Sequence, residues 1–425
     1  MIARIEPGVL SGTIPAIPSK SEAHRALICA ALSDTPTRIV CRASSEDIEA
    51  TLACLDALGA RIEIEGGVYT VTPMGRAARA AKPLDCRESG STLRFLLPVA
   101  AARGGARFEG APRLSKRPLL PLIRALREHG VTVDTDGELP LTVSGQLSAG
   151  VFALPGNISS QYITGLLLAA PLPDGTTTIR VAEPIESKPY IALTIDVLHV
   201  FGVDAEIVHE DGCTCYTMRA RAAYSSPGSF KVGGDWSNAA FWLAAGALSE
   251  TGVCVEGLSL SSKQADRSIL GALSLFGVRV VRTAHSAAAV PDELRGARID
   301  VSSCPDLVPA IAPLAALAEG RTVITGAGRL RLKESDRLAS ISNALNRIGA
   351  HVDVIDDALV FEGVGQLHGG EIDAAADHRI AMMAAIAATR ADGPVLIHGA
   401  QCTAKSYPDF FEDFAALGGR MEWRV

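Results

Sequence analysis

Charged and hydroxylated residues gather in six short segments of the chain, each directly before an apolar stretch. The side chains among them that are suited to chemistry are Lys20, Arg25, Arg94, Gln161, Asp306, His378 and Arg379. Arginine and lysine bind carboxylates and phosphates, and an aspartate placed among them can act as a general base. One such segment would be interpreted as a simple helix cap, whereas six in register favour a shared anion-binding site.

Each segment precedes a stretch that is apolar on every side, which predicts a helix buried on all sides. The predicted helices cover residues 26–32, 93–102, 163–170, 239–248, 307–318 and 380–388. Helix N-termini carry unpaired N–H groups and the positive end of the helix dipole. If three of these helices pack together in one domain, their N-termini meet on one face and favour anions there.

A second pattern, an apolar residue followed by glycine and the start of a strand, recurs six times. Its glycines are Gly59, Gly130, Gly202, Gly277, Gly349 and Gly418, about 70 residues apart. Glycine suits the left-handed position after a helix, and the β-branched residues that follow favour a strand. The chain is therefore predicted to contain six α/β units, each with a buried helix, an amphipathic helix such as 121–129 or 336–348, and short strands.

The length, composition and net charge of the chain indicate which class of protein it belongs to. A chain of 425 residues exceeds one ordinary hydrophobic core, which predicts two domains, and 48% hydrophobic with 20% charged residues is typical of globular proteins. The net charge of −7 argues against a nucleic-acid partner. Nine scattered cysteines without a C-x-x-C pair indicate reduced thiols rather than disulfides or zinc. Short apolar runs and an N-terminus without targeting features predict a soluble, cytoplasmic protein without a membrane segment.

Eight segments together resemble the enolpyruvyl transferase family, and they follow its order along the whole chain. They are 17–25 (IPSKSEAHR), 88–94 (ESGSTLR), 112–118 (PRLSKRP), 159–162 (SSQY), 187–190 (SKPY), 333–337 (KESDR), 377–379 (DHR) and 405–409 (KSYPD). The resemblance implies a two-domain inside-out α/β barrel built from six repeats of about 70 residues, three per domain. Residues 18–232 would form the first domain, residues 1–17 with 233–425 the second, and the active site would lie in the cleft between them.

The same resemblance implies a reaction and its substrates. The enolpyruvyl group of phosphoenolpyruvate would move to the 5-hydroxyl of shikimate 3-phosphate, through a tetrahedral intermediate and with release of phosphate. This is a step toward chorismate and the aromatic amino acids. The resemblance implies no metal or organic cofactor, and we expect a monomer whose partners are these two small molecules.

The resemblance also assigns site residues. For phosphoenolpyruvate it implies Lys20, Gly90, Arg117, Gln161, Arg337, Arg379 and Lys405. For shikimate 3-phosphate it implies Lys20, Ser21, Arg25, Ser159, Ser160, Gln161, Ser187, Tyr190, Asp306 and Lys333. Asp306 is the candidate base for the 5-hydroxyl, while Glu334 and Lys20 are unranked candidates for protonating the methylene carbon. The plainer interpretations are an N-cap for Asp306, a half-buried aromatic for Tyr190 and, as the favoured one, a helix cap for His378.

Several positions depart from the usual family pattern. Residues 88–91 read Glu-Ser-Gly-Ser where Asn-Ala-Gly-Thr is common, and Phe95 replaces a common proline. Arg329 stands where many members carry an asparagine that binds the substrate phosphate. These changes put inhibitor sensitivity and the Arg329 contact in doubt, but not the reaction.

The sequence disfavours three other functions. A sister enzyme that acts on a UDP-aminosugar has Lys-Asn where Lys20-Ser21 stand, and a loop cysteine that is missing between Ala111 and Pro118. A non-catalytic phosphate-binding repeat protein would not need Asp306 and Glu334 among so many cations. A nucleotide enzyme is disfavoured because its glycine-rich motifs are missing from the sequence.

Overall fold

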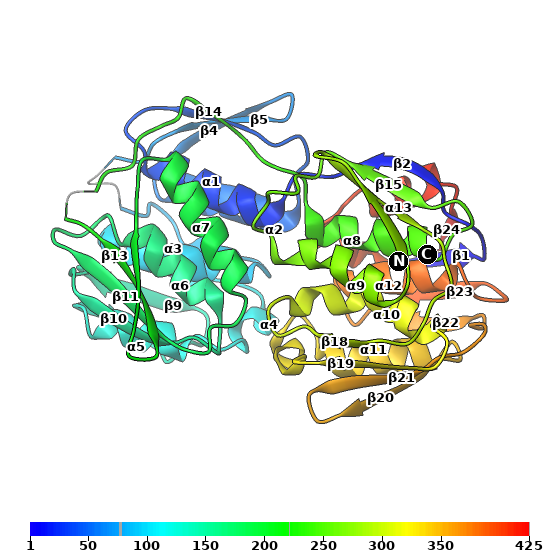
Figure 1. Ribbon diagram of the computed structural model, residues 1–425. Helices are drawn as coiled ribbons and strands as arrows, with labels where there is room; N and C mark the ends of the chain where they lie inside the picture. Colours follow the sequence, from blue (N-terminus) through cyan, green and yellow to red (C-terminus); the bar gives the residue numbers. More distant parts are fainter. Residues whose placement is uncertain (76–78, 221, 425) are drawn as a thin grey trace. The chain divides into compact units, whose positions relative to one another are not determined.

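The structure is a computed structural model that describes residues 1–75, 79–220 and 222–424. It divides into two compact units (Figure 1): unit 1 comprises Met1–Ser19 and Gly233–Val425, and unit 2 comprises Lys20–Val232. The two points where the chain changes unit are hydrogen-bonded to each other. The Ser19 N–H donates to the Gly233 carbonyl at 2.8 Å, and the Asp235 N–H donates to the Ile17 carbonyl at 2.8 Å. None of the helices that the structure describes is long and apolar enough to cross a membrane.

Unit 2 contains three four-stranded sheets, each built from one parallel pair followed by two antiparallel neighbours. The first sheet has the order β14 (Ser229–Lys231), β3 (Thr37–Val40), β5 (Val68–Thr72) and β4 (Arg61–Glu65). The second is β6 (Leu84–Asp85), β7 (Ala106–Glu109), β9 (Leu141–Gly145) and β8 (Val131–Val133). The third is β10 (Val151–Pro155), β11 (Thr177–Ala182), β13 (Cys213–Met218) and β12 (Glu206–Glu210).

Unit 1 repeats this order three times, and two of its sheets take strands from the N-terminus of the chain. Its first sheet is β2 (Gly12–Pro15), β15 (Val253–Glu256), β17 (Ser286–Val290) and β16 (Arg279–Arg282). The second is β18 (Arg298–Asp300), β19 (Arg321–Thr325), β21 (Ala358–Glu362) and β20 (His351–Ile355). The third is β22 (Gly370–Asp373), β23 (Val395–His398), β1 (Ile2–Glu6) and β24 (Arg420–Arg424). Six sheets of identical topology confirm the predicted six-repeat, inside-out α/β fold.

Apolar helices form the inside of each unit. They are α1 (Lys20–Leu32), α3 (Gly90–Ala102) and α6 (Ser160–Ala169) in unit 2, and α8 (Trp236–Ala247), α10 (Val308–Leu317) and α12 (His378–Ala388) in unit 1. Every residue of α12 is buried, as its apolar sequence predicts. Within unit 1 the three helices contact one another in pairs and lie inside its strands (Figure 1).

The remaining helices keep part of their surface exposed. They are α2 (Glu46–Ala57), α4 (Pro112–Ser115), α5 (Leu120–Arg127), α7 (Lys188–Val200), α9 (Ile269–Leu275), α11 (Arg337–Asn346) and α13 (Phe410–Ala416), with short 3-10 turns at η1 (Ala265–Ser268), η2 (Pro305–Leu307), η3 (Gly328–Leu332) and η4 (Ala400–Lys405). The six repeat glycines all have φ between 77° and 98°, which confirms their predicted left-handed conformation after a helix. All nine cysteines are free thiols.

At four of the buried helices, the N-cap is a residue of the polar segment that precedes the helix. The side chains of Ser89, Ser159, Asp235 and Asp377 each accept a backbone N–H from the first turn of α3, α6, α8 and α12. Asp306 is different, because it lies inside the 3-10 turn η2 that leads into α10, and the N-cap of that turn is Cys304. The N-cap interpretation of Asp306 is therefore wrong, and its carboxylate is available for other contacts.

Candidate active site

Lys20 is the first residue of α1, and its ammonium group is anchored by a carboxylate of unit 2. Its Nζ lies 2.7 Å from Oδ2 of Asp47, in the first turn of α2. A carboxylate is stabilised at that position by the helix N-terminus. Asp47 was not among the residues assigned from the sequence, although the acidic run after Ser45 marks a helix start. The pair keeps the Lys20 side chain in one place, only 21% exposed.

Arg25 is buried and connects the segments that carry other predicted ligands. Its guanidinium donates to the carbonyls of Ser21 (2.5 Å) and Tyr190 (3.1 Å). It also donates to Oγ1 of Thr194 at 2.8 Å and to Oγ1 of Thr164 at 3.3 Å. Burial lowers the pKa of Arg25 to about 10, which leaves it charged at neutral pH. A direct contact of Arg25 with a substrate would require one of these bonds to be exchanged.

Ser21 lies in the first turn of α1, and the other three predicted serine ligands lie at the starts of α6 and α7. Ser159 caps α6 by accepting the Gln161 N–H at 3.3 Å, and Ser160 is the buried first residue of that helix. Ser187 precedes α7 with φ 53°. A serine in the left-handed region is strained, and such strain clusters at functional sites. Tyr190 is half-buried in α7, so the structure does not separate its two interpretations.

Gly90, Arg117 and Gln161 of unit 2 are brought together around Arg94. A Cβ placed on Gly90 would lie 2.6 Å from Nη1 of both Arg117 and Arg94. Gln161 accepts from Arg94 Nη1 at 3.1 Å and donates to Ser91 Oγ at 3.0 Å. Glycine at position 90 thus leaves room for two guanidinium groups, whose ends would have to shift to admit a larger residue.

Gly90→Ala gives the first testable prediction. The added methyl group must displace the ends of Arg94 and Arg117, and a displaced cation binds its anion less well. We expect the KM for phosphoenolpyruvate to rise by about 10-fold, while the Kd for shikimate 3-phosphate stays within about threefold. Steady-state kinetics and calorimetry would measure the two values. Gly271→Ala is the matched control, since a Cβ on that helical glycine meets nothing within 4 Å. An unchanged KM in the Gly90 variant would contradict the prediction.

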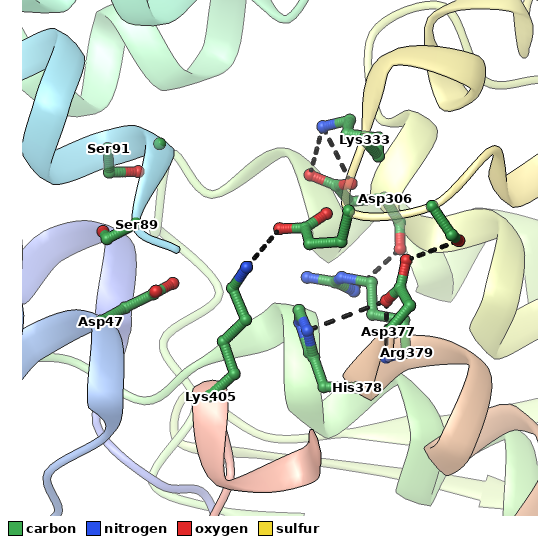
Figure 2. Close-up of polar contacts among 12 residues, drawn as sticks. Asp47, Ser89, Ser91, Asp306, Lys333, Asp377, His378, Arg379 and Lys405 are labelled. Carbon is green, nitrogen blue, oxygen red and sulfur yellow. Dashed lines mark hydrogen bonds and ion pairs between the residues drawn. The ribbon is translucent and has the colours of Figure 1, made fainter. Parts of the chain in front are cut away.

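Unit 1 contains a second group of predicted residues, which we call the Asp306 cluster: Asp306, Lys333, Glu334, Arg337, Asp377, Arg379 and Lys405. Figure 2 shows Lys333 directed at the Asp306 carboxylate, and its Nζ lies 3.0 Å from both oxygens. Arg337 Nη1 donates to Oδ1 of Asp306 at 2.7 Å. Glu334 lies 2.7 Å from Arg337 Nη2 and 3.5 Å from Lys405 Nζ. The candidate base, Asp306, and one of the two candidate acids, Glu334, therefore share one arginine.

Arg337 is the centre of this cluster. Its side chain is 1% exposed, and four of its five N–H groups donate to carboxylates of Asp306, Glu334 and Asp377. The bidentate partner, Asp377, is completely buried and also accepts from Ser335 Oγ at 3.0 Å. From the sequence, Asp377 is predicted only to belong to the polar segment 377–379 before a buried helix. A local pattern does not show its contact with Arg337, which is 40 residues away in the chain.

Asp377 also corrects the interpretation of His378. Its Oδ1 accepts the backbone N–H of Arg379 at 3.0 Å, so Asp377 is the N-cap of α12. His378 is the first helical residue and does not have the favoured cap role. An aspartate just before the helix has the right side-chain length to reach the N–H groups of the first turn.

Arg379 connects the three helix starts of unit 1. Its Nη1 donates to the carbonyl of Asp306 at 2.9 Å, and its Nη2 donates to Oγ of Ser237 in α8 at 2.5 Å. The starts of α8, η2 and α12 therefore meet, as the sequence predicted for three buried helices. Ser237 was not assigned from the sequence. The result is a positive helix-terminal field at the same place as Lys333 and Lys405.

The charges of the Asp306 cluster set its protonation. Burial alone would raise the pKa of Asp306, but Lys333, Arg379 and Arg337 together hold it well below its usual range. Asp306 is therefore ionised at neutral pH. Burial lowers the pKa of Lys333 to about 8, against the opposing effect of Asp306 and with a further lowering from Arg329 in η3. Arg329 thus acts on the cluster through its charge, whatever its contact with substrate.

The pKa of Lys333 gives a second prediction. Lys333 carries its charge below pH 8 and loses it above, so the attraction for an anionic substrate falls as the pH rises through 8. We expect kcat/KM for shikimate 3-phosphate to decline above pH 8, and Lys333→Arg to shift that decline to higher pH because arginine stays charged. Lys82→Arg, at an exposed lysine paired with Asp56, is the control. A decline that is identical in the Lys333→Arg variant would exclude Lys333 as its cause.

Comparison with solved structures identifies the class of protein. A structure of EPSP synthase from Acinetobacter baumannii matches with a TM-score of 0.83 and 27% sequence identity, covering 99% of this chain and 100% of that chain. The enolpyruvyl transferase NikO from Streptomyces tendae has a TM-score of 0.80 over 99% of this chain and 98% of that chain, and at 22% identity this likeness concerns the fold alone. The fold is that of the enolpyruvyl transferases.

Comparison of sequences identifies the family within this class. The family model described as EPSP synthase (3-phosphoshikimate 1-carboxyvinyltransferase) matches residues 5–414. A relative from Clostridium kluyveri with the name 3-phosphoshikimate 1-carboxyvinyltransferase is 41% identical, covering 99% of this chain and 98% of the relative. One with the same name from Clostridium beijerinckii is 40% identical over 99% of both chains. The chain belongs to the EPSP synthase family.

Proposed function

We propose that this chain transfers the enolpyruvyl group of phosphoenolpyruvate to the 5-hydroxyl of shikimate 3-phosphate, with release of phosphate, on the route to chorismate and the aromatic amino acids. The observation that carries this proposal is the Asp306 cluster. In it, the ionised Asp306 and a second carboxylate, Glu334, share Arg337, and each also pairs with a lysine. Membership of the EPSP synthase family supports the same reaction. A phosphate-binding protein without catalysis would gain nothing from two half-buried carboxylates that oppose its anionic ligand.

The proposed roles of the residues follow from the charges of the substrates and of the side chains. Phosphoenolpyruvate carries a carboxylate and a phosphate, which suit the fixed cations around Gly90 in unit 2 and those of the Asp306 cluster in unit 1. We assign to it Lys20, Gly90, Arg117, Gln161, Arg337, Arg379 and Lys405. Shikimate 3-phosphate is assigned to Lys20, Ser21, Arg25, Ser159, Ser160, Gln161, Ser187, Tyr190, Asp306 and Lys333.

The proposed chemistry is an addition followed by an elimination. Asp306 accepts the proton of the 5-hydroxyl, whose oxygen attacks C2 of phosphoenolpyruvate, and C3 receives a proton from Glu334 or Lys20. The resulting tetrahedral intermediate then loses phosphate from C2 and a proton from C3, which restores the double bond. The cations stabilise the charge of the departing phosphate. We propose that the chain works as a cytoplasmic monomer without a metal or organic cofactor.

One experiment tests this function directly. The protein would be incubated with shikimate 3-phosphate and phosphoenolpyruvate, phosphate release would be followed, and the product identified by mass spectrometry. We expect one phosphate per molecule of enolpyruvyl product. A parallel incubation with UDP-N-acetylglucosamine as acceptor tests the sister activity. Turnover of the aminosugar alone, or of neither acceptor, would overturn the proposal.

A further inference from the structure

Arg94 is the fifth residue of α3, and its guanidinium group joins three separate segments of unit 2. The residue is 3% exposed. Its Nη1 donates to the side-chain oxygen of Gln161 at 3.1 Å and lies 3.5 Å from the Gly90 carbonyl. Its Nη2 donates to the carbonyl of Pro118 at 3.0 Å. These contacts are made to oxygens that are 4, 24 and 67 residues away in the chain.

Each of the three segments carries a residue assigned to phosphoenolpyruvate. Gly90 and Gln161 contact Arg94 directly, and Pro118 directly follows Arg117. Tyr162 strengthens the last connection, because its hydroxyl donates to the same Pro118 carbonyl and its ring lies 5.8 Å from the Arg94 guanidinium carbon. Arg94 therefore determines how the backbone at Arg117 lies relative to Gly90 and Gln161.

The planar guanidinium is suited to this task and an ammonium group is not. Its two Nη atoms point in fixed directions, one toward Gln161 and one toward Pro118. A lysine keeps the charge but has a single nitrogen on a flexible stem, so it does not hold both oxygens in this geometry. Arg94 also contacts Gly90 so closely that a Cβ there would lie 2.6 Å from its Nη1.

We propose that Arg94 is a positioning residue for phosphoenolpyruvate: it does not need to touch the substrate, and it holds Arg117, Gly90 and Gln161 in their relative places. This inference rests on the proposed function and adds a residue outside the assigned ligands. The shikimate 3-phosphate ligands Ser187 and Tyr190 are held by other bonds, such as the one between the Tyr190 carbonyl and Arg25. Gln161 is assigned to both substrates, whereas Gly90 and Arg117 are assigned to phosphoenolpyruvate alone. Arg94 should therefore affect phosphoenolpyruvate more than shikimate 3-phosphate.

The test is Arg94→Lys, which keeps the positive charge but replaces the two Nη donors of the guanidinium by a single ammonium nitrogen. We expect the KM for phosphoenolpyruvate to rise roughly 10- to 100-fold, as a misplaced ligand set predicts, with the Kd of shikimate 3-phosphate within about threefold. Arg127→Lys is the matched control, since Arg127 also donates to backbone carbonyls, those of Val133 and Thr135 in unit 2. The control should leave both constants within about twofold. Wild-type activity in the same assay separates failure of this inference from failure of the proposed function.

A double-mutant cycle with Arg117→Ala shows whether Arg94 acts through Arg117. If it does, Arg94→Lys should raise the KM much less in the Arg117→Ala background than in the wild type. Thermal unfolding of each variant would identify a loss of fold, and in that event Arg94→Gln, which can still donate to one carbonyl, replaces Arg94→Lys. Independent effects in the cycle, an equal loss for both substrates, or an unchanged KM in the Arg94 variants would overturn the proposal.

Discussion

Replacing Asp306 by asparagine is expected to lower turnover by about 10²–10⁴-fold and to leave the Kd of shikimate 3-phosphate within about threefold. Asparagine has nearly the size of aspartate and still accepts a hydrogen bond from a substrate hydroxyl, but it does not take up a proton at neutral pH. The carboxylate it replaces is ionised, because Lys333, Arg379 and Arg337 outweigh its burial and hold its pKa low. Steady-state kinetics together with calorimetric binding would measure both quantities.

The structure supplies a control for Asp306 that the sequence did not. Asp336 is the N-cap of α11 and accepts the Ala339 N–H at 3.2 Å, so it is an aspartate with a cap role in the same unit. Asparagine caps about as well as aspartate, and Asp336→Asn should leave turnover close to that of the wild type. If Asp306→Asn behaved like Asp336→Asn, Asp306 would not be the base, and Glu334 and Lys20 would have to be tested in its place.

Arg337→Ala is expected to destabilise the protein by about 3–5 kcal/mol, in addition to weakening phosphoenolpyruvate binding. The substitution removes the cation that four hydrogen bonds connect to Asp306, Glu334 and Asp377, and it leaves a completely buried carboxylate at Asp377. Removing one partner of a buried ion pair costs far more than removing an exposed one. Thermal unfolding should show a fall in Tm of roughly 10 °C or more.

Arg331→Ala is the matched control for this effect. Arg331 also belongs to unit 1 and pairs with Asp336 at 3.4 Å, but its side chain is 40% exposed. An exposed pair is worth about 1 kcal/mol at most, so its Tm should change little. A Tm for Arg337→Ala that equals that of the control would mean that the three carboxylates find other partners. Because Arg337→Ala also lowers stability, Arg117→Ala and Arg379→Ala are better tests of phosphoenolpyruvate binding alone. Each is expected to lower the affinity for phosphoenolpyruvate by roughly 10- to 100-fold.

The repeat architecture could be predicted from the sequence. The six glycines, spaced about 70 residues apart, predict a left-handed conformation after a helix, and all six have it. The stretches without polar residues, such as 380–388, had to be buried on every side, and α12 is. Ser89, Ser159 and Asp235 cap the helices that follow them. These features depend on residues close together in the chain, where helix geometry and backbone φ preferences are sufficient to predict the structure.

Which charges meet could be seen only in the folded structure. Arg379 reaches Ser237 across 142 residues, and Arg337 reaches Asp377 across 40, so a local pattern shows one end of each contact. His378 was interpreted as the cap although its neighbour Asp377 has the role, and Asp377 was not assigned its second task of holding Arg337. The physical reason is that buried helix starts meet only after their apolar bodies have packed. Packing then decides which carboxylate neutralises which cation, because every buried charge must find a partner within hydrogen-bonding distance.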